Sequence, residues 1–111
     1  MPFINTKYSG SITPEQETEI KTELGKAIAL LGKSENWLML GFEPEATLYF
    51  GGEKSEKIAF VDVSLFGNSQ RTNLFTAEVC RILKNALGVP ADHVYVKYSP
   101  VKEWGWNGDN F

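Results

Sequence analysis

The sequence predicts a two-layer α+β fold, in which a tandem βαβ repeat forms a four-stranded sheet with two helices on one face. Shifting the 111-residue chain by 56 residues aligns its halves without a gap over most of their length and places Gly32 on Gly88. Each half reads as strand, helix, strand, and right-handed crossovers put both helices on the same side of the sheet. We expect a single domain over 1–111, with repeats at about 1–55 and 56–111.

The first unit begins with an extended run over 2–8. Thr13, Pro14 and Gln16 have the pattern of an N-cap, a proline at the first helical position and a capping-box partner. The apolar residues that follow recur at helical spacing and form one face: Ile20, Leu24, Ala27, Ile28 and Leu31. We expect the helix to stop at the first of the two aligned glycines, and a strand to follow over 38–43.

The middle of the chain predicts a surface that one copy cannot cover. A short strand over 47–50 and a turn over 51–56 lead into a long strand over 57–66. That strand carries apolar residues on both faces, with Ile58, Phe60 and Phe66 on one and Ala59, Val61, Val63 and Leu65 on the other. Two helices cover only one face of a sheet. The simplest explanation is self-association, and the alternative is a partly exposed strand.

The second unit repeats the plan. Ser69 is the expected N-cap of its helix, and Gly88 and Pro90 are expected to end it. The apolar face of this helix consists of Phe75, Val79, Ile82, Leu83 and Ala86. We expect a returning strand over 94–98.

Composition and charge exclude several classes of protein. Hydrophobic residues make up 42% and charged residues 23%, which is ordinary for a globular domain. Eleven Lys and Arg against fourteen Asp and Glu give a net charge of -3. This argues against a nucleic-acid groove, since no basic excess is available for phosphate contacts. No apolar run approaches the roughly 20 residues that cross a bilayer, so we expect no membrane insertion. The Met-Pro start lacks an apolar leader, which favours a cytoplasmic location.

Six short motifs occur in a fixed order along the whole chain. They are Pro2 after the initiator Met, Gly32-Lys33, Phe50-Gly51-Gly52, Phe66-Gly67, Asp92-His93-Val94-Tyr95, and the tail Trp104-Gly105-Trp106-Asn107-Gly108-Asp109-Asn110-Phe111. Each motif is weak alone. Together, in this order and spacing, they resemble the macrophage migration inhibitory factor and D-dopachrome tautomerase family, within the tautomerase superfamily.

The resemblance implies a homotrimer whose three sheets surround a central channel, with active sites at the subunit boundaries. Such a trimer would cover the second apolar face of the sheet. The implied activity is keto–enol tautomerisation of phenylpyruvate-like α-keto acids, which are the expected small aromatic substrates, or of dopachrome-like compounds. The resemblance implies neither a cofactor nor a metal.

Pro2 is the candidate general base. Removal of Met1 would leave a proline with a free secondary amine, whereas an internal proline nitrogen is an amide without basicity. An α-amino group has a pKa of about 7.7–8.0, and an apolar pocket or a nearby lysine lowers it because each disfavours the cation. A neutral amine can then accept a proton at neutral pH. The initiator Met is also removed before proline in proteins where that proline has no catalytic role.

The resemblance carries two further catalytic roles and two pocket positions. Lys33 is the expected anchor for the substrate carboxylate, although a cation after a helix end can also act only on the helix dipole. Tyr95 matches a pocket tyrosine that a neighbouring subunit contributes, and the alternative is an aromatic residue packed in the sheet. Leu65 and Phe66 stand where the family often has Ser-Ile, and Phe66 can still donate its backbone N–H to the substrate.

The remaining expected substrate-binding residues are Trp37, Lys97, Val101, Trp104, Trp106 and Phe111. Lys97 replaces an Asn of the mammalian proteins, which favours dianionic substrates or disfavours aromatic ones. The aromatic residues can form a stacking wall for a planar substrate or anchor a subunit interface, and both roles are compatible at a subunit-boundary site.

Cysteine usage separates this chain from the mammalian cytokine. Lys57-Ile58-Ala59-Phe60 occupies the place of its Cys-x-x-Cys, which excludes thiol–disulfide chemistry there. The single Cys80 is expected to be a buried, inert core residue, and it rules out a multi-cysteine zinc site.

Two other functions stay open. Family members also act as cytokine-like ligands of cell-surface receptors after leaderless secretion, with a vestigial tautomerase site, and a receptor is then the partner. The third hypothesis is a small-molecule sensor domain without catalysis. A monomeric or dimeric state in solution, instead of a trimer, would favour it.

Overall fold

The structure is a computed structural model that describes residues 1–111. Two βαβ units form its body: β1 (Pro2–Tyr8), α1 (Pro14–Ala27) and β2 (Met39–Glu43), then β5 (Ala59–Phe66), α2 (Thr72–Leu87) and β6 (Val94–Val101). Two small hairpins are added to this body: β3 (Tyr49–Phe50) with β4 (Glu53–Lys54), and β7 (Gly105–Trp106) with β8 (Asp109–Asn110). Short 3-10 turns occupy Ile28–Leu31, Glu35–Trp37 and Ala91–His93.

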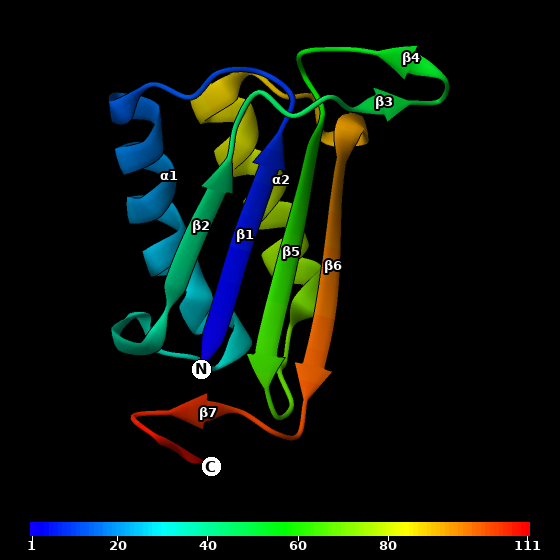
Figure 1. The fold of residues 1–111 in the computed structure, drawn as a ribbon. Coiled ribbons are helices and arrows are strands. Elements are labelled where there is room, and N and C mark those ends of the chain that lie inside the picture. The colour runs from blue at the N-terminus through cyan, green and yellow to red at the C-terminus, as the bar shows by residue number, and fades with distance from the viewer.

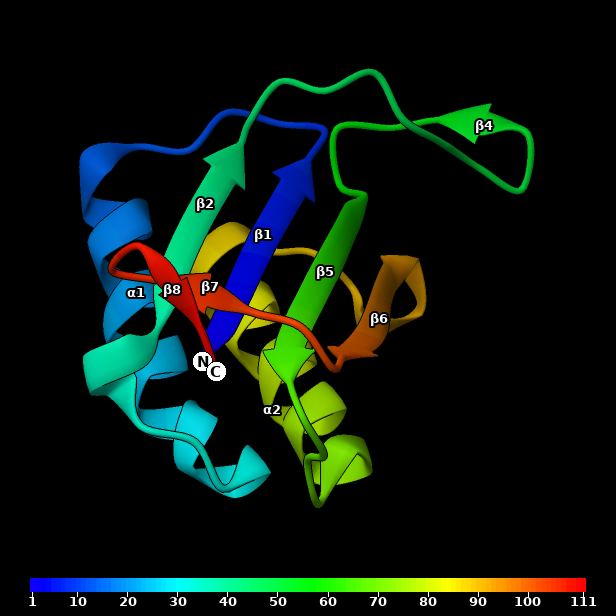
Figure 2. The ribbon, with the colours of Figure 1, turned by 60° about the horizontal axis from the view of Figure 1, so that its bottom comes forward.

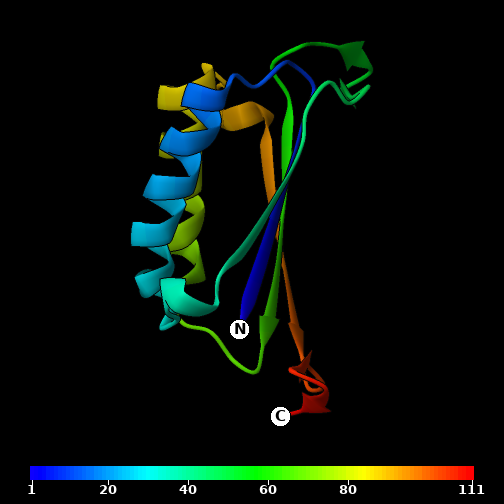
Figure 3. The same ribbon diagram turned by 60° about the vertical axis from the view of Figure 1, so that its left-hand side comes forward.

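The four long strands form one mixed sheet in the order β2-β1-β5-β6. The outer pairs are parallel, as a βαβ unit requires, and the central pair β1–β5 is antiparallel. Both helices lie against one face of the sheet (Figures 1 and 3). The predicted fold class, with its tandem repeat, is confirmed.

Helix α1 begins as its sequence predicts. The Thr13 side chain accepts a hydrogen bond from the Gln16 N–H at 3.1 Å, and the Gln16 side chain accepts one from the Thr13 N–H at 2.9 Å. The helix tightens into the 3-10 turn over Ile28–Leu31 and stops at Gly32, whose φ of 74° is left-handed. Glycine adopts this conformation without steric cost, which explains the stop.

The expected cap of the second helix is wrong. Helix α2 begins at Thr72, so Ser69 lies outside it, and no side chain caps its start. The N-cap is instead Arg71, whose left-handed φ of 53° turns the chain into the helix. The Arg71 Nε donates to the Leu30 carbonyl at 2.9 Å, so this turn is tied to the end of the first helical segment. Gly88 ends α2 as predicted, with a φ of 74°.

The strand limits differ from the predictions by a few residues, and β6 runs on to Val101. Ile58, which strand alternation assigns to the open face, is buried just before β5, where its N–H donates to the Ser9 Oγ at 2.9 Å. The hydroxyl of Ser9 therefore completes the hydrogen bonding of this buried segment.

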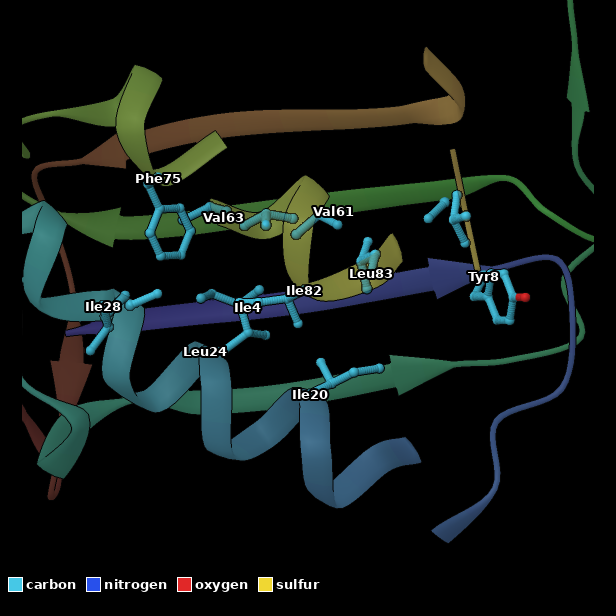
Figure 4. Packing of buried hydrophobic residues seen from close by; sticks show 14 of the residues in the cluster. Ile4, Tyr8, Ile20, Leu24, Ile28, Val61, Val63, Phe75, Ile82 and Leu83 are labelled. Atoms are coloured by element: carbon cyan, nitrogen blue, oxygen red, sulfur yellow. The ribbon is translucent and has the colours of Figure 1, made fainter. Parts of the chain in front are cut away.

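The hydrophobic core lies between the helices and the sheet (Figure 4). Strands β1 and β5 contribute Ile4, Val61, Val63 and Leu65, and the helices contribute Ile20, Leu24, Phe75, Val79, Ile82 and Leu83. Burying each such side chain contributes roughly 1.5–3 kcal/mol. The core thus holds the central strands rigidly, and the ends of β1 and β5 are fixed with them.

The other face of the sheet is open in a single chain. Met39 is 67% exposed and Tyr95 is 60% exposed there. Polar pairs cross its middle, where the Asn5 Nδ2 donates to Glu43 at 2.6 Å. Neither helix is long and apolar enough to cross a membrane.

Candidate active site

The N-terminal end of β1 brings Pro2 beside the end of β5. Pro2 is buried and lies opposite Leu65 in the antiparallel register. The Phe66 N–H donates to the Met1 carbonyl at 3.1 Å. Because that carbonyl carbon is bonded to the Pro2 nitrogen, the Phe66 amide points at the immediate surroundings of the proposed base.

Lys33 reaches the same place from the end of the first helical segment. The left-handed Gly32 turns the chain, and the Lys33 Nζ donates to the carbonyls of Phe66 and Asn68, each at 3.0 Å. An ammonium group has three donors, so one remains for another acceptor. A small hollow of about 250 Å³ borders this position, between Gly32 and Asn68.

The electrostatics at this end favour a neutral terminal amine. Burial, followed by the charge of Lys33, lowers the pKa of the Met1 amine from its usual value. Both causes disfavour the ammonium form. They are the two causes that the sequence predicts for the amine of Pro2, which would be the terminal residue after Met1 is removed.

A chain of aromatic side chains borders this end of the sheet. The ring centres of Trp37 and Trp106 are 4.9 Å apart, edge to face, and Trp106 stacks on Phe111 at 6.4 Å. Phe111 reaches Phe66 at 5.4 Å. Trp37, Trp106 and Phe111 are each about half exposed, so their faces are open to a ligand or a second chain.

The C-terminal hairpin β7–β8 positions these rings. Its two turn residues, Asn107 and Gly108, have φ values of 53° and 85°, the left-handed pair of a tight hairpin turn. The Phe111 N–H donates to the Trp104 carbonyl at 3.1 Å and closes the hairpin. Val101 lies opposite Phe66 in the β5–β6 register, at the base of the hairpin. Figure 2 shows β7 and β8 in front of the sheet at the end where β1 begins.

Tyr95 and Lys97 lie farther along the sheet. Tyr95 is opposite Phe60, five residues before Leu65 on β5, which is about 17 Å at the usual rise of a strand. Lys97 forms an ion pair with Asp62 at 3.3 Å, and its ammonium lies 5.8 Å from the centre of the Phe60 ring. Within one chain these two residues do not join the residues around Pro2.

The partners of these two residues were not predicted from the sequence. Asp62, the one acidic residue within the apolar strand β5, is the partner of Lys97, and its lone charge among apolar neighbours is the available signal. The Phe50 ring contacts the rings of both Tyr95 and His93 at the start of β6. Their motifs were visible in the sequence, but nothing in it showed that they meet.

Cys80 is half-buried on α2 and lies outside the core cluster, so the prediction of a core residue is wrong. Burial raises the pKa of its thiol, which keeps the thiol protonated and poorly reactive.

The Lys57 Nζ donates to the Leu87 carbonyl at 2.7 Å, at the end of α2. No three His, Cys, Asp or Glu side chains lie close enough together to hold a metal ion.

A larger cavity lies elsewhere. About 670 Å³ of space opens at the far end of β1, under the β3–β4 hairpin, between Ser9, Glu45 and Glu56. Its lining is polar and includes none of the residues around Pro2. Pro2, Lys33 and Phe66 therefore lie at the opposite end of the sheet from this cavity.

Known proteins share both the sequence pattern and the fold. The family profile "Macrophage migration inhibitory factor (MIF)" matches residues 1–111. MIF2 of Leishmania major is 29% identical with a TM-score of 0.93, covering 100% of this chain and 97% of that chain. The homologue from Prochlorococcus marinus is 28% identical with a TM-score of 0.85, covering 98% of both chains.

More distant proteins share the fold alone. A fused 4-OT described as an asymmetric trimer is 10% identical with a TM-score of 0.84, covering 97% of this chain and 94% of its own. No curated protein sequence matches the chain. The profile match over the full length, together with the fold, places the chain in the macrophage migration inhibitory factor family, within the tautomerase superfamily.

Proposed function

We propose that the protein is a cofactor-free keto–enol tautomerase of phenylpyruvate-like α-keto acids or dopachrome-like compounds. Pro2 acts as the general base once Met1 is removed. The family and fold support a tautomerase or related role for the chain. The substrate class and the base are our inference from the residues around Pro2.

One observation carries the proposal. The Phe66 N–H donates to the carbonyl oxygen of Met1, one bond beyond the carbon attached to the Pro2 nitrogen. When Met1 is absent, that N–H is free to bind a carboxylate oxygen within a few ångströms of the amine. The donor for the substrate and the base for its proton therefore share one small space.

The side chains support a stepwise mechanism. Lys33 and the Phe66 N–H hold the substrate carboxylate, and charge-assisted bonds of this kind are the stronger ones. The neutral amine of Pro2 removes a proton from the carbon beside the keto group, and the Lys33 cation stabilises the enolate that develops. The Pro2 ammonium then delivers the proton to the enolate oxygen, which gives the enol and restores the neutral amine. No redox step or added group is required.

The proposal includes a homotrimer. The open sheet face exposes Met39 and Tyr95, and Tyr95 lies too far along the sheet to reach the Pro2 of its own chain. In a trimer, Tyr95 of a neighbouring copy polarises the substrate carbonyl. Lys97 is neutralised by Asp62, which reduces the positive charge it offers to a second carboxylate.

The first experiment compares two forms of one sequence. Intact mass identifies protein with and without Met1, and turnover of phenylpyruvate is measured on each. We expect activity only without Met1, since the attached residue makes the Pro2 nitrogen an amide. Pro2→Gly, likewise processed, should lower turnover about 100-fold or more while the trimer persists, given the usual contribution of a general base.

Two outcomes contradict the proposal. Full turnover in protein that retains Met1 would exclude Pro2 as the general base. A processed trimer without turnover on either substrate class favours the other function, a cytokine-like secreted protein that binds a cell-surface receptor through a vestigial site.

A further inference from the structure

Two motifs that are far apart in the sequence meet in space. The ring centre of Phe50, in hairpin β3–β4, lies 4.9 Å from that of His93 and 5.4 Å from that of Tyr95. Figure 1 shows this hairpin beside the start of β6, beyond the end of the sheet. The mechanism above uses Tyr95 but gives no role to Phe50 or to its hairpin.

The two tyrosines of β6 are held in different ways. Tyr98 faces the helices, and its hydroxyl lies 2.7 Å from the Thr76 Oγ1 and donates to the Thr72 carbonyl at 2.9 Å. Tyr95 lies on the open face and is 60% exposed. Its ring packs against Phe50, so the direction of its hydroxyl depends on an aromatic contact.

Phe50 is itself well fixed. Its hairpin turns at Gly51 and Gly52, whose φ values of 58° and 86° suit glycine and match a tight two-residue turn. The ring also contacts His93, whose Nδ1 is 2.8 Å from the Asp92 Oδ1. The Phe50 ring is therefore held between its own hairpin and the turn that begins β6 by contacts with His93 and Tyr95.

We propose that Phe50 is a positioning residue for Tyr95: its ring sets the direction in which the Tyr95 hydroxyl enters the neighbouring copy's site. This inference rests on the proposed tautomerase function and deepens it. Hairpin β3–β4, far from Pro2 in its own chain, thereby becomes part of the apparatus that orients the substrate carbonyl.

The kinetic test is a double-mutant cycle in processed protein with phenylpyruvate. Phe50→Ala should lower kcat/KM about three- to tenfold, the size expected from the loss of one aromatic pair. Phe50→Tyr keeps the ring and should stay within twofold of the parent. In a Tyr95→Phe background, Phe50→Ala should have no further effect, because the hydroxyl that it directs is gone.

The matched control is Tyr49→Ala, which removes an exposed ring from the same hairpin and should leave kcat/KM unchanged. If the fold-losses in kcat/KM from Phe50→Ala and Tyr95→Phe multiply in the double variant, the two residues act independently. That result overturns the proposal. If Phe50→Ala fails to fold, Phe50→Leu replaces it, since leucine fills space without an aromatic face, and the same cycle is measured.

A second measurement does not depend on turnover. The protein contains four tyrosines, so fluorotyrosine labelling gives a simple ¹⁹F spectrum in which Tyr95→Phe identifies one signal. Phe50→Ala should move the Tyr95 signal by removing the ring beside it, and Tyr49→Ala should not. If the parent protein lacks turnover, the proposed function fails while this spectrum still tests the contact. An unmoved Tyr95 signal overturns the positioning role in either case.

Discussion

The two βαβ units share one backbone plan but place different chemistry at equivalent positions. Gly32 and Gly88 both end a helical segment with a φ of 74°. The next residue is Lys33 in the first unit, where it bonds to main-chain carbonyls beside Pro2. In the second unit it is Val89, which is fully buried in the core.

The same contrast holds along the strands. The 56-residue offset that aligns the glycines places Pro2 on Ile58 and Met39 on Tyr95. Pro2, the candidate base, corresponds to the buried aliphatic residue Ile58. The exposed Met39 corresponds to Tyr95, the candidate hydrogen-bond donor to the substrate carbonyl. Positions where the units agree therefore build the fold, and positions where they differ in chemistry supply the candidate site.

The largest effect is expected where the units agree. Leu31 and Leu87, one residue before the paired glycines, are 1% and 4% exposed. Leu31→Ala and Leu87→Ala should each lower the free energy of unfolding by about 2–5 kcal/mol, through lost burial and the cavity that remains. Urea unfolding measures both, and Leu74→Ala on the exposed side of α2 is the control. A large loss in only one unit would contradict the structural equivalence.

The next effect is expected where the units differ. Lys33→Val gives the first unit the residue type of the second, and kcat/KM should fall about 10- to 100-fold, since a hydrogen bond to a charged group is worth about 1.5–3 kcal/mol. Lys57→Val is the matched control, because that lysine also donates to a main-chain carbonyl, at the end of α2. Equal losses of activity in both variants would show that Lys33 acts through stability alone.

The pH dependence of turnover tests the surroundings of the terminal amine. Burial and the Lys33 charge lower the pKa of the Met1 amine, and the same surroundings should lower that of Pro2 in processed protein. Since only the neutral amine accepts a proton, activity should persist below the ordinary α-amino pKa of about 7.7–8.0 and fall only at lower pH. Lys33→Met should move this acidic limb upward. If the acidic limb of the parent protein's pH profile lies at or above the ordinary α-amino pKa, that result argues against Pro2 as the base.

Local patterns were sufficient to predict most of the fold. The capping box at Thr13, the helical spacing of apolar residues and the two glycines depend on neighbours in sequence, and the structure has all three. The C-terminal hairpin was also within reach, because Asn107-Gly108 is a strong signal for a tight hairpin turn. The elements predicted from the sequence end with the strand over 94–98 and do not include this hairpin.

The candidate site was only partly predictable for a physical reason. Lys97 was expected to favour dianionic substrates or to disfavour aromatic ones, yet its charge is paired with that of Asp62 on the neighbouring strand. That pairing depends on the β5–β6 register, which connects residues 35 positions apart and leaves no local trace in the sequence. The Phe50–Tyr95 contact is long-range in the same way. Contacts of this kind can be predicted only once the order and register of the strands are known.

The smallest effect concerns the helix starts, where the aligned residues Thr13 and Ser69 differ in role. Thr13→Ala removes a cap whose hydroxyl accepts the Gln16 N–H, and it should cost about 1 kcal/mol in the free energy of unfolding. Ser69→Ala should change it by no more than about 0.5 kcal/mol, because Ser69 lies outside α2 and caps nothing. Urea unfolding of the two variants against the parent protein makes the comparison. Equal losses would mean that α2 begins at Ser69 in solution, so that the two units start their helices alike and the left-handed Arg71 turn is replaced by a capped one.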